Sequence, residues 1–218
     1  MSTLTTAPLA PLLDQLFADS ETTKREFKER VGNLSMEERA ALMNNTDPFE
    51  LYSRAKDVHL AVDRETATLL YILARSGGAR AIVEFGASFG VSTLHLAAAL
   101  RDHGGGRLIS SEFEPSKVVR ARENLSRAGL ADLVDLREGD ALQTLAQDLP
   151  SPIDLLFLDG AKPHYLPVLS LAEPHLRPGA LVVADNSEGS PDYLSYVRCS
   201  GKYVSTQFND VEISIRSV

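Results

Sequence analysis

From residue 79 onward the sequence alternates between short apolar runs and longer stretches in which apolar residues recur at helical spacing. The runs are rich in branched aliphatic side chains, which is typical of strands buried on both faces. Five such strands are predicted, over residues 79–85, 107–112, 133–139, 153–159 and 179–185. Helices between them are predicted over residues 91–100, 115–128, 141–147 and 165–176. Strands that alternate with helices are joined by right-handed crossovers, so the pattern indicates a parallel sheet with helices on both faces.

The last part of the chain departs from this alternation. Residues 202–208 and 211–217 flank Asn209-Asp210, a pair that is typical of a tight hairpin turn. We therefore predict the α/β class, with a doubly wound, Rossmann-like sheet of five parallel strands followed by a C-terminal antiparallel hairpin.

The first third of the chain predicts helices and no strand. Apolar residues from Leu12 to Phe17 recur at helical spacing ahead of a charged run. Further helices are predicted over residues 35–43, 48–58 and 66–74. Asp63 is placed to cap the last of these helices, and Gly77-Gly78 to end it. We expect residues 1–58 to form a helical cap or lid, and residues 59–218 to form the α/β domain.

Composition and charge mainly exclude some classes of protein and of binding partner. Of the 218 residues, 44% are hydrophobic and 24% charged, which argues against disorder. The formal net charge of -8 disfavours non-specific binding to nucleic acid or to an anionic membrane. Cys199 is the only cysteine, so no disulfide can form within the chain and a cytoplasmic location is expected. No early segment joins basic residues to a long apolar run, so we expect neither a signal peptide nor a membrane span.

A glycine-bearing loop follows the first predicted strand, in the segment EFGASFG. Gly86 and Gly90 allow a sharp turn and a close approach of the backbone to a ligand. A dinucleotide-binding loop would have the spacing G-x-G-x-x-G and would face a pyrophosphate. Here the spacing differs, and Glu84 stands just before the loop, where a carboxylate repels pyrophosphate and attracts a sulfonium or ammonium group. The loop therefore favours S-adenosylmethionine over NAD.

Further polar residues stand near the ends of the next predicted strands. Glu112 ends the second strand and is placed to accept hydrogen bonds from both ribose hydroxyls. Asp140, followed by Ala141, ends the third and is placed to receive the adenine amino group, although it also suits a helix cap. Ser92, at the start of the first core helix, is placed to hold the methionyl carboxylate.

Two carboxylates and a carboxamide end the fourth and fifth predicted strands. Asp159 ends the fourth, and Asp185 and Asn186 end the fifth. Adjacent strand ends lie about 5 Å apart, so these side chains can converge. Hard oxygen ligands of this kind suit Mg²⁺, or another divalent cation such as Mn²⁺ or Ca²⁺. The alternative is that Asp159 caps a loop and that Asp185-Asn186 forms a turn.

Five segments occur in the order found in a known enzyme family: VEFGASFGVST, SSEFEP, FLDGAKPHYLP, LVVADN and GSPDYLSYVR. On these segments, residues 60–218 resemble the cation-dependent O-methyltransferases. This family of class I S-adenosylmethionine-dependent methyltransferases includes the catechol and caffeoyl-CoA O-methyltransferases. The resemblance implies that Glu84, Ser92 and Glu112 bind the cofactor and that Asp159, Asp185 and Asn186 bind the metal ion. With the residues of the loop, the predicted cofactor-binding set is Val62, Glu84, Gly86, Ser88, Ser92, Glu112, Asp140, Ala141 and Asp159.

The resemblance also implies a reaction. Lys162 matches the proposed general base and acts beside Asp159, while Leu60, Lys162 and Glu212 are predicted to contact the acceptor. The expected activity is methyl transfer to a hydroxyl of a small, metal-chelating acceptor by a homodimeric enzyme. Two alternatives remain open at this point. One is methylation of a modified tRNA base, and the other is a nucleotide- or NAD-binding dehydrogenase-type domain.

Overall fold

The computed structural model describes residues 2–33, 35 and 57–217. The helices predicted over residues 35–43 and 48–58 therefore lie almost entirely outside the described residues. The helices in the described part are α1 (Leu9–Gly32), α4 (Arg64–Ser76), α5 (Val91–Asp102), α6 (Pro115–Ala128), α7 (Ala141–Thr144), α8 (Tyr165–Ala172) and α9 (Pro191–Cys199). The strands are β1 (Ala81–Phe85), β2 (Arg107–Glu112), β3 (Val134–Glu138), β4 (Ile153–Leu158), β5 (Leu176–Ala184), β6 (Tyr203–Phe208) and β7 (Val211–Arg216).

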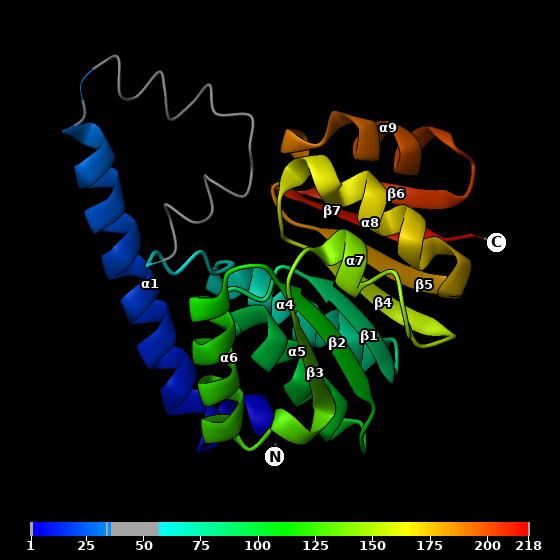
Figure 1. The fold of residues 1–218 in the computed structure, drawn as a ribbon. Coiled ribbons are helices and arrows are strands. Elements are labelled where there is room, and N and C mark those ends of the chain that lie inside the picture. The colour runs from blue at the N-terminus through cyan, green and yellow to red at the C-terminus, as the bar shows by residue number, and fades with distance from the viewer. Residues whose placement is uncertain (1, 34, 36–56, 218) are drawn as a thin grey trace.

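Within the described residues, seven strands form one sheet in the order β3-β2-β1-β4-β5-β7-β6. Strands β1 to β5 are parallel, and β7 joins β5 antiparallel before β6 pairs with β7. This confirms the predicted doubly wound sheet with a C-terminal hairpin (Figure 1). The order reverses at β1, whose neighbours are β2 on one side and β4 on the other, and ligands bind at such a switch point in open α/β sheets.

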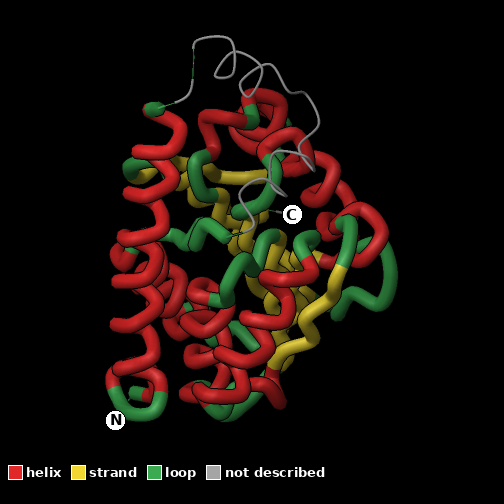
Figure 2. Tube along the Cα trace, turned by 60° about the vertical axis from the view of Figure 1, so that its left-hand side comes forward, coloured by secondary structure: helices red, strands yellow, loops and turns green. Residues whose placement is uncertain are grey.

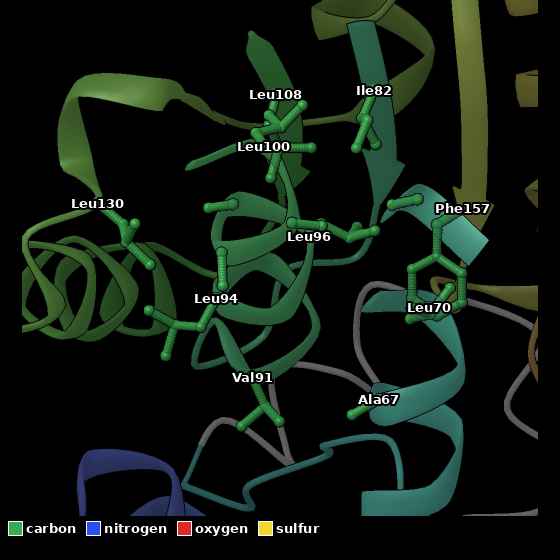
Figure 3. Close-up of a cluster of buried hydrophobic side chains, with 14 of the residues drawn as sticks. Ala67, Leu70, Ile82, Val91, Leu94, Leu96, Leu100, Leu108, Leu130 and Phe157 are labelled. Carbon is green, nitrogen blue, oxygen red and sulfur yellow. The ribbon is translucent and has the colours of Figure 1, made fainter. Parts of the chain in front are cut away.

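Each central strand is buried on both faces, which explains its continuous apolar sequence. In β1, Ile82 packs into the hydrophobic cluster formed with α1, α4, α5 and α6, whereas Val83 packs into the cluster formed with α7, α8 and α9. In β4, Phe157 packs into the first of these clusters and Leu156 packs into the second. Figure 3 shows the first cluster, in which Leu96 of α5 lies between the sheet and α4. The helices thus form a layer on either face of the sheet (Figure 1).

Helix α1 is longer than the periodicity predicted, and its two halves differ in environment. Its buried residues are Leu9, Leu12, Leu13, Leu16, Phe17 and Ser20. Most later residues of the helix are exposed. Figures 1 and 2 show α1 as a long column at the edge of the molecule, with its first half beside α6. The start of the chain is also anchored, since Asp102 at the end of α5 accepts hydrogen bonds from the Thr3 backbone N–H (3.0 Å) and from Tyr71 Oη (2.6 Å). The first half of α1 therefore belongs to the same core as the sheet.

Helix α4 begins and ends where the capping signals placed it. Asp63 accepts a hydrogen bond from Thr66 N at 2.6 Å, and Gly77 is the C-terminal cap. The sequence pattern does not predict helix α9, and helix α7 is shorter than the pattern predicts. No helix in the described ranges is both long and apolar enough to cross a lipid bilayer.

We predict that Leu96→Ala lowers the free energy of unfolding by about 2–5 kcal/mol, because it opens a cavity where the side chain is fully buried. The matched control is Ile72→Ala on the neighbouring helix α4, where the side chain is 53% exposed and the change should stay within about 0.5 kcal/mol. Urea denaturation of both variants measures the difference. Equal losses would show that the cluster of Figure 3 is not the stabilising core.

Candidate active site

Backbone hydrogen bonds hold the ends of five neighbouring strands in one row. After β1, the N–H groups of Gly86 and Ala87 both donate to Ser111 O, at 3.0 and 3.1 Å. After β3, Gly139 N donates to Glu112 O at 2.9 Å. The loops after β4 and β5 follow in the same way, since Asp159 N donates to Phe85 O at 2.8 Å and Asp185 N to Leu158 O at 2.9 Å. The polar residues at the strand ends are therefore neighbours, as the parallel sheet predicted.

A pocket opens beside this row of strand ends. Its wall combines apolar side chains with a few polar groups, as is typical of a small-molecule site. Among the predicted site residues, those that line it are Leu60, Gly86, Ser88, Glu112, Asp140, Ala141 and Asp159. Most of the predicted cofactor-binding residues are thus brought together.

The loop after β1 needs glycine because it touches the loop after β4. Gly86 has φ +100°, and a Cβ on it would lie 2.6 Å from Asp159 O, which is closer than real contacts allow. On the other side of this contact, a Cβ on Gly160 would lie 2.3 Å from Cζ of Phe85. Both glycines are therefore required for the two strand ends to meet, and the pocket wall is built from that contact.

The Glu112 carboxylate is held in place by backbone donors. Its Oε2 accepts from Ser88 N at 2.7 Å and its Oε1 from Glu114 N at 2.8 Å. Ser88 reaches this position with a left-handed backbone, at φ 48°. Each carboxylate oxygen can accept more than one hydrogen bond, so Glu112 keeps acceptor capacity for hydroxyl groups in the pocket.

Glu84 is completely buried beneath the loop rather than in the pocket wall. Its Oε2 accepts from Thr93 Oγ1 at 2.6 Å and from Ser110 Oγ at 2.5 Å, while its Oε1 has no hydrogen-bond partner among the described residues. Burial raises the pKa of Glu84, and the hydroxyl hydrogen bonds oppose that rise. An unpartnered buried oxygen is costly, so this carboxyl is suited to a cationic or donor group of a ligand.

Three more predicted cofactor residues have clear structural roles. Ser92 is buried in the first turn of α5, and Val62 packs in the core cluster, so neither lines the pocket. Asp140 caps α7 by accepting from Leu142 N at 2.9 Å and also lines the pocket. Asp140 is therefore a helix cap, and its place in the pocket wall leaves the predicted contact with adenine possible as well.

The metal-binding and catalytic residues predicted from the sequence lie beside the pocket, after β4 and β5. Lys162 Nζ lies 3.6 Å from Asp159 Oδ1 and donates to Asp185 O at 3.0 Å. It also donates to Tyr165 Oη at 2.5 Å, and Tyr165 Oη donates to Asp185 O at 2.8 Å. Lys162 is thus fixed between the two loops that carry the aspartates.

The same corner is rich in acidic oxygen atoms. Burial raises the pKa of the Asp159 carboxyl, and the nearby Asp185 raises it further, while Lys162 lowers it. Burial also raises the pKa of Asp185, together with the charges of Asp210 and Asp63. Asn186 Nδ2 donates to Asp210 Oδ2 at 2.8 Å. A divalent cation is the kind of ligand that such a set of oxygen atoms would accept.

The structure does not gather a larger metal-binding cluster. In the part of the chain that it describes, no group of three or more His, Cys, Asp or Glu side chains is placed to hold a metal ion. The predicted set differs from such a cluster because its third ligand is the carboxamide of Asn186. The predicted metal site would therefore consist of two carboxylates and an amide, which would leave other positions on an ion for water or acceptor oxygens.

Glu212, which was predicted to bind the acceptor, is held elsewhere. Its backbone pairs with Ala184 at the end of β5, and its fully buried carboxylate accepts from Arg198 at 2.6 and 2.9 Å and from Ser205 Oγ at 2.5 Å. These partners lower the pKa of Glu212 against the effect of burial. The carboxylate therefore ties the hairpin to α9, and Glu212 is absent from the pocket wall.

Sequence reasoning missed several residues of the pocket wall. They are Phe85, Ser111, Phe113, Lys117, Gly139, Gly160, Ala161 and His164. Most stand next to a predicted site residue, so a wider window around each strand end would have included them. Lys117 is different, because its inward direction depends on how α6 packs.

The doubly wound sheet and its pocket at the switch point match the predicted class I methyltransferase type of fold, and comparison with known proteins agrees. Residues 83–187 match the family model described as a methyltransferase domain. The chain is 37% identical over 130 residues to a catechol O-methyltransferase of Niastella koreensis, and the match covers 58% of each sequence. The catechol O-methyltransferase of Mus musculus is 30% identical over 172 residues, which cover 75% of this chain and 64% of the mouse sequence. The chain thus spans between a half and two thirds of these relatives.

A solved structure shows the same similarity. The O-methyltransferase TomG from Streptomyces achromogenes, determined in complex with SAM, is 26% identical and has a TM-score of 0.63. The likeness covers 85% of this chain and all of that one. In sequence and in fold, the chain is thus similar to O-methyltransferases, the catechol O-methyltransferases among them.

We predict that Gly86→Ala is far more damaging than Gly104→Ala. Both glycines have positive φ, +100° and +88°, so both substitutions strain the backbone by about 1–2 kcal/mol. Only at Gly86 does the new Cβ meet backbone atoms, which adds about 1–3 kcal/mol of overpacking. Urea denaturation measures the stability of each variant. Similar losses at the two positions would argue against the contact between Gly86 and Asp159.

For Glu212→Gln we expect a loss of stability, by about 1–3 kcal/mol, because a charged hydrogen-bonded pair is broken. Binding of S-adenosylhomocysteine, measured by isothermal titration calorimetry, should stay within about twofold, which is below 1 kcal/mol. If Glu212 bound the acceptor instead, the variant would unfold like the wild type and its KM for catechol would rise.

Proposed function

We propose that the chain is an S-adenosylmethionine-dependent O-methyltransferase. Its acceptor is a small molecule with two neighbouring oxygens, catechol-like in chemistry, and a divalent cation such as Mg²⁺ assists the transfer. The observation that carries this proposal is the placement of Lys162 between the loops of Asp159 and Asp185, beside a pocket that also contains Glu112.

The residues at the Glu112 end of the pocket fit an adenosine-containing cofactor. Glu112 is oriented by two backbone N–H groups and can accept hydrogen bonds from ribose hydroxyls. Asp140 lines the same pocket and suits the adenine amino group. Beneath the loop, the unpartnered Oε1 of Glu84 suits the ammonium group of a methionyl moiety. When bound, S-adenosylmethionine supplies an electrophilic methyl group on a sulfonium.

The residues at the other end fit a hard divalent cation. Asp159, Asp185 and Asn186 would hold it, with water or acceptor oxygens completing its coordination. A bound cation lowers the pKa of a coordinated hydroxyl, which makes that oxygen a better nucleophile. The raised pKa values of Asp159 and Asp185 reflect burial that such a cation would offset.

Lys162 is placed to orient the acceptor hydroxyl and, in its neutral amine form, to take the hydroxyl proton. Its Nζ is fixed by Tyr165 Oη and by Asp185 O, so the side chain has little freedom to leave the site. A Cβ on Gly189 would lie 2.9 Å from Cγ of Lys162, so this glycine makes room for the lysine stem. Holding both reactants in attack geometry can contribute about 7–11 kcal/mol to catalysis, and a fixed lysine serves that purpose.

We expect the purified full chain to methylate catechol with S-adenosylmethionine and Mg²⁺, and to lose this activity in EDTA. Lys162→Met should lower kcat by about 10²–10⁴-fold, the range for a lost general base. Mass spectrometry of the methylated product measures the turnover. Lys28→Met, on the exposed part of α1, is the matched control and should leave turnover unchanged.

Each part of the proposal can fail separately. Full turnover in EDTA would show that no cation takes part in the reaction. Full turnover of Lys162→Met would show that Lys162 is not the general base. If S-adenosylhomocysteine does not raise the thermal unfolding midpoint but NAD does, the chain binds a dinucleotide and the methyl-transfer proposal is wrong.

A further inference from the structure

Lys117 lines the pocket and has no part in the function proposed above. It is the third residue of α6, in the first turn after Glu112, and only 2% of it is exposed. Its Nζ lies 5.7 Å from the centre of the Phe89 ring, which itself stacks on His59 at 3.8 Å. Lysine side chains are almost never buried to this extent without a partner, so the position needs an explanation.

The negative charges around Lys117 attract its ammonium but form no hydrogen bond with it. Glu112, Glu114 and Asp57 act on it through space, and no hydrogen bond to a described residue contributes. Burial alone lowers the pKa of Lys117. The Phe89 face offers a cation–π contact, which is weaker than a hydrogen bond to an ammonium. Lys117 is therefore a largely buried side chain in the pocket wall, and its ammonium makes no hydrogen bond to a described residue.

Glu112 shows the complementary arrangement in the same wall. Its carboxylate is held by the backbone N–H groups of Ser88 and Glu114 and forms no ion pair with Lys117. Glu112 and Lys117 thus place an acceptor and a donor in the wall of one pocket without forming an ion pair with each other. A vicinal diol matches such a pair, because each hydroxyl group can donate to the carboxylate and accept from the ammonium.

We propose that Lys117 is a cofactor-binding residue that donates a hydrogen bond to a ribose hydroxyl whose other partner is Glu112. The ligand class is an adenine nucleoside with a free ribose diol, and the inference rests on the proposed function. On this basis Lys117 makes the pocket selective for ribose over deoxyribose, since a ligand without the hydroxyl cannot form this charged hydrogen bond.

The test compares two ligands on the full chain by isothermal titration calorimetry. One is S-adenosylhomocysteine and the other is its 2′,3′-dideoxy analogue, which lacks both ribose hydroxyls. Lys117→Met should weaken the binding of S-adenosylhomocysteine by about 10–100-fold, which corresponds to the loss of one hydrogen bond to a charged group. The same variant should change the affinity of the dideoxy analogue by less than about threefold, because the partner hydroxyl is already absent.

Arg120→Met is the matched control, since it removes a positive charge from the same helix at an exposed ion pair with Glu123, 3.7 Å long. It should leave both affinities unchanged. If Lys117→Met does not fold, Lys117→Gln keeps a donor of similar length and should give a smaller loss that is again confined to S-adenosylhomocysteine. Equal losses for the two ligands, or no loss for either, would overturn the role of Lys117. Failure of the wild-type chain to bind S-adenosylhomocysteine at all would instead overturn the proposed function.

Discussion

The close contact between the loops after β1 and β4 is the constraint on which the rest of the site depends. Gly86 approaches Asp159 so closely that no side chain fits between them, and Asp159 N in turn donates to Phe85 O. This contact occurs at the switch point of the sheet, where the chain turns toward β2 on one side and β4 on the other. It brings the proposed cofactor-binding and metal-binding ends of the site within reach of one another, as the proposed methyl transfer between two bound molecules requires.

Burial of charge follows from that constraint and explains how the site is organised. Glu84, Asp159, Asp185 and Lys117 all lie where water is largely excluded, which raises the pKa values of the acids and lowers that of the lysine. Such groups are costly in the free protein, and the cost is offset when ligands of opposite charge or matching hydrogen bonds are bound. Lys162, beside the two aspartates, is held by hydrogen bonds to Tyr165 Oη and to Asp185 O.

The N-terminal region is more closely joined to the catalytic fold than a separate lid would be. The first half of α1 packs in the core, and its middle holds the segment that leads to the pocket. Ser20 Oγ donates to His59 O at 2.9 Å, and Lys24 Nζ donates to Ala61 O at 2.7 Å. Leu60 between them lines the pocket. The division into a cap of residues 1–58 and a following domain stays a prediction, but these contacts make α1 a support for the cofactor pocket.

The sequence by itself determined the strands, most of the helices and the acids at the strand ends, because local periodicity and capping residues act within a few positions of the chain. It also predicted that Glu112 and Asp159 would share one edge of the sheet, since parallel strands place their ends together. Only the tertiary structure decided where the carboxylate of Glu212 and the ammonium of Lys117 lie. Glu212 is captured by Arg198 of α9, and Lys117 is directed into the pocket by the packing of α6. These directions depend on contacts between elements far apart in the chain, which no local pattern specifies.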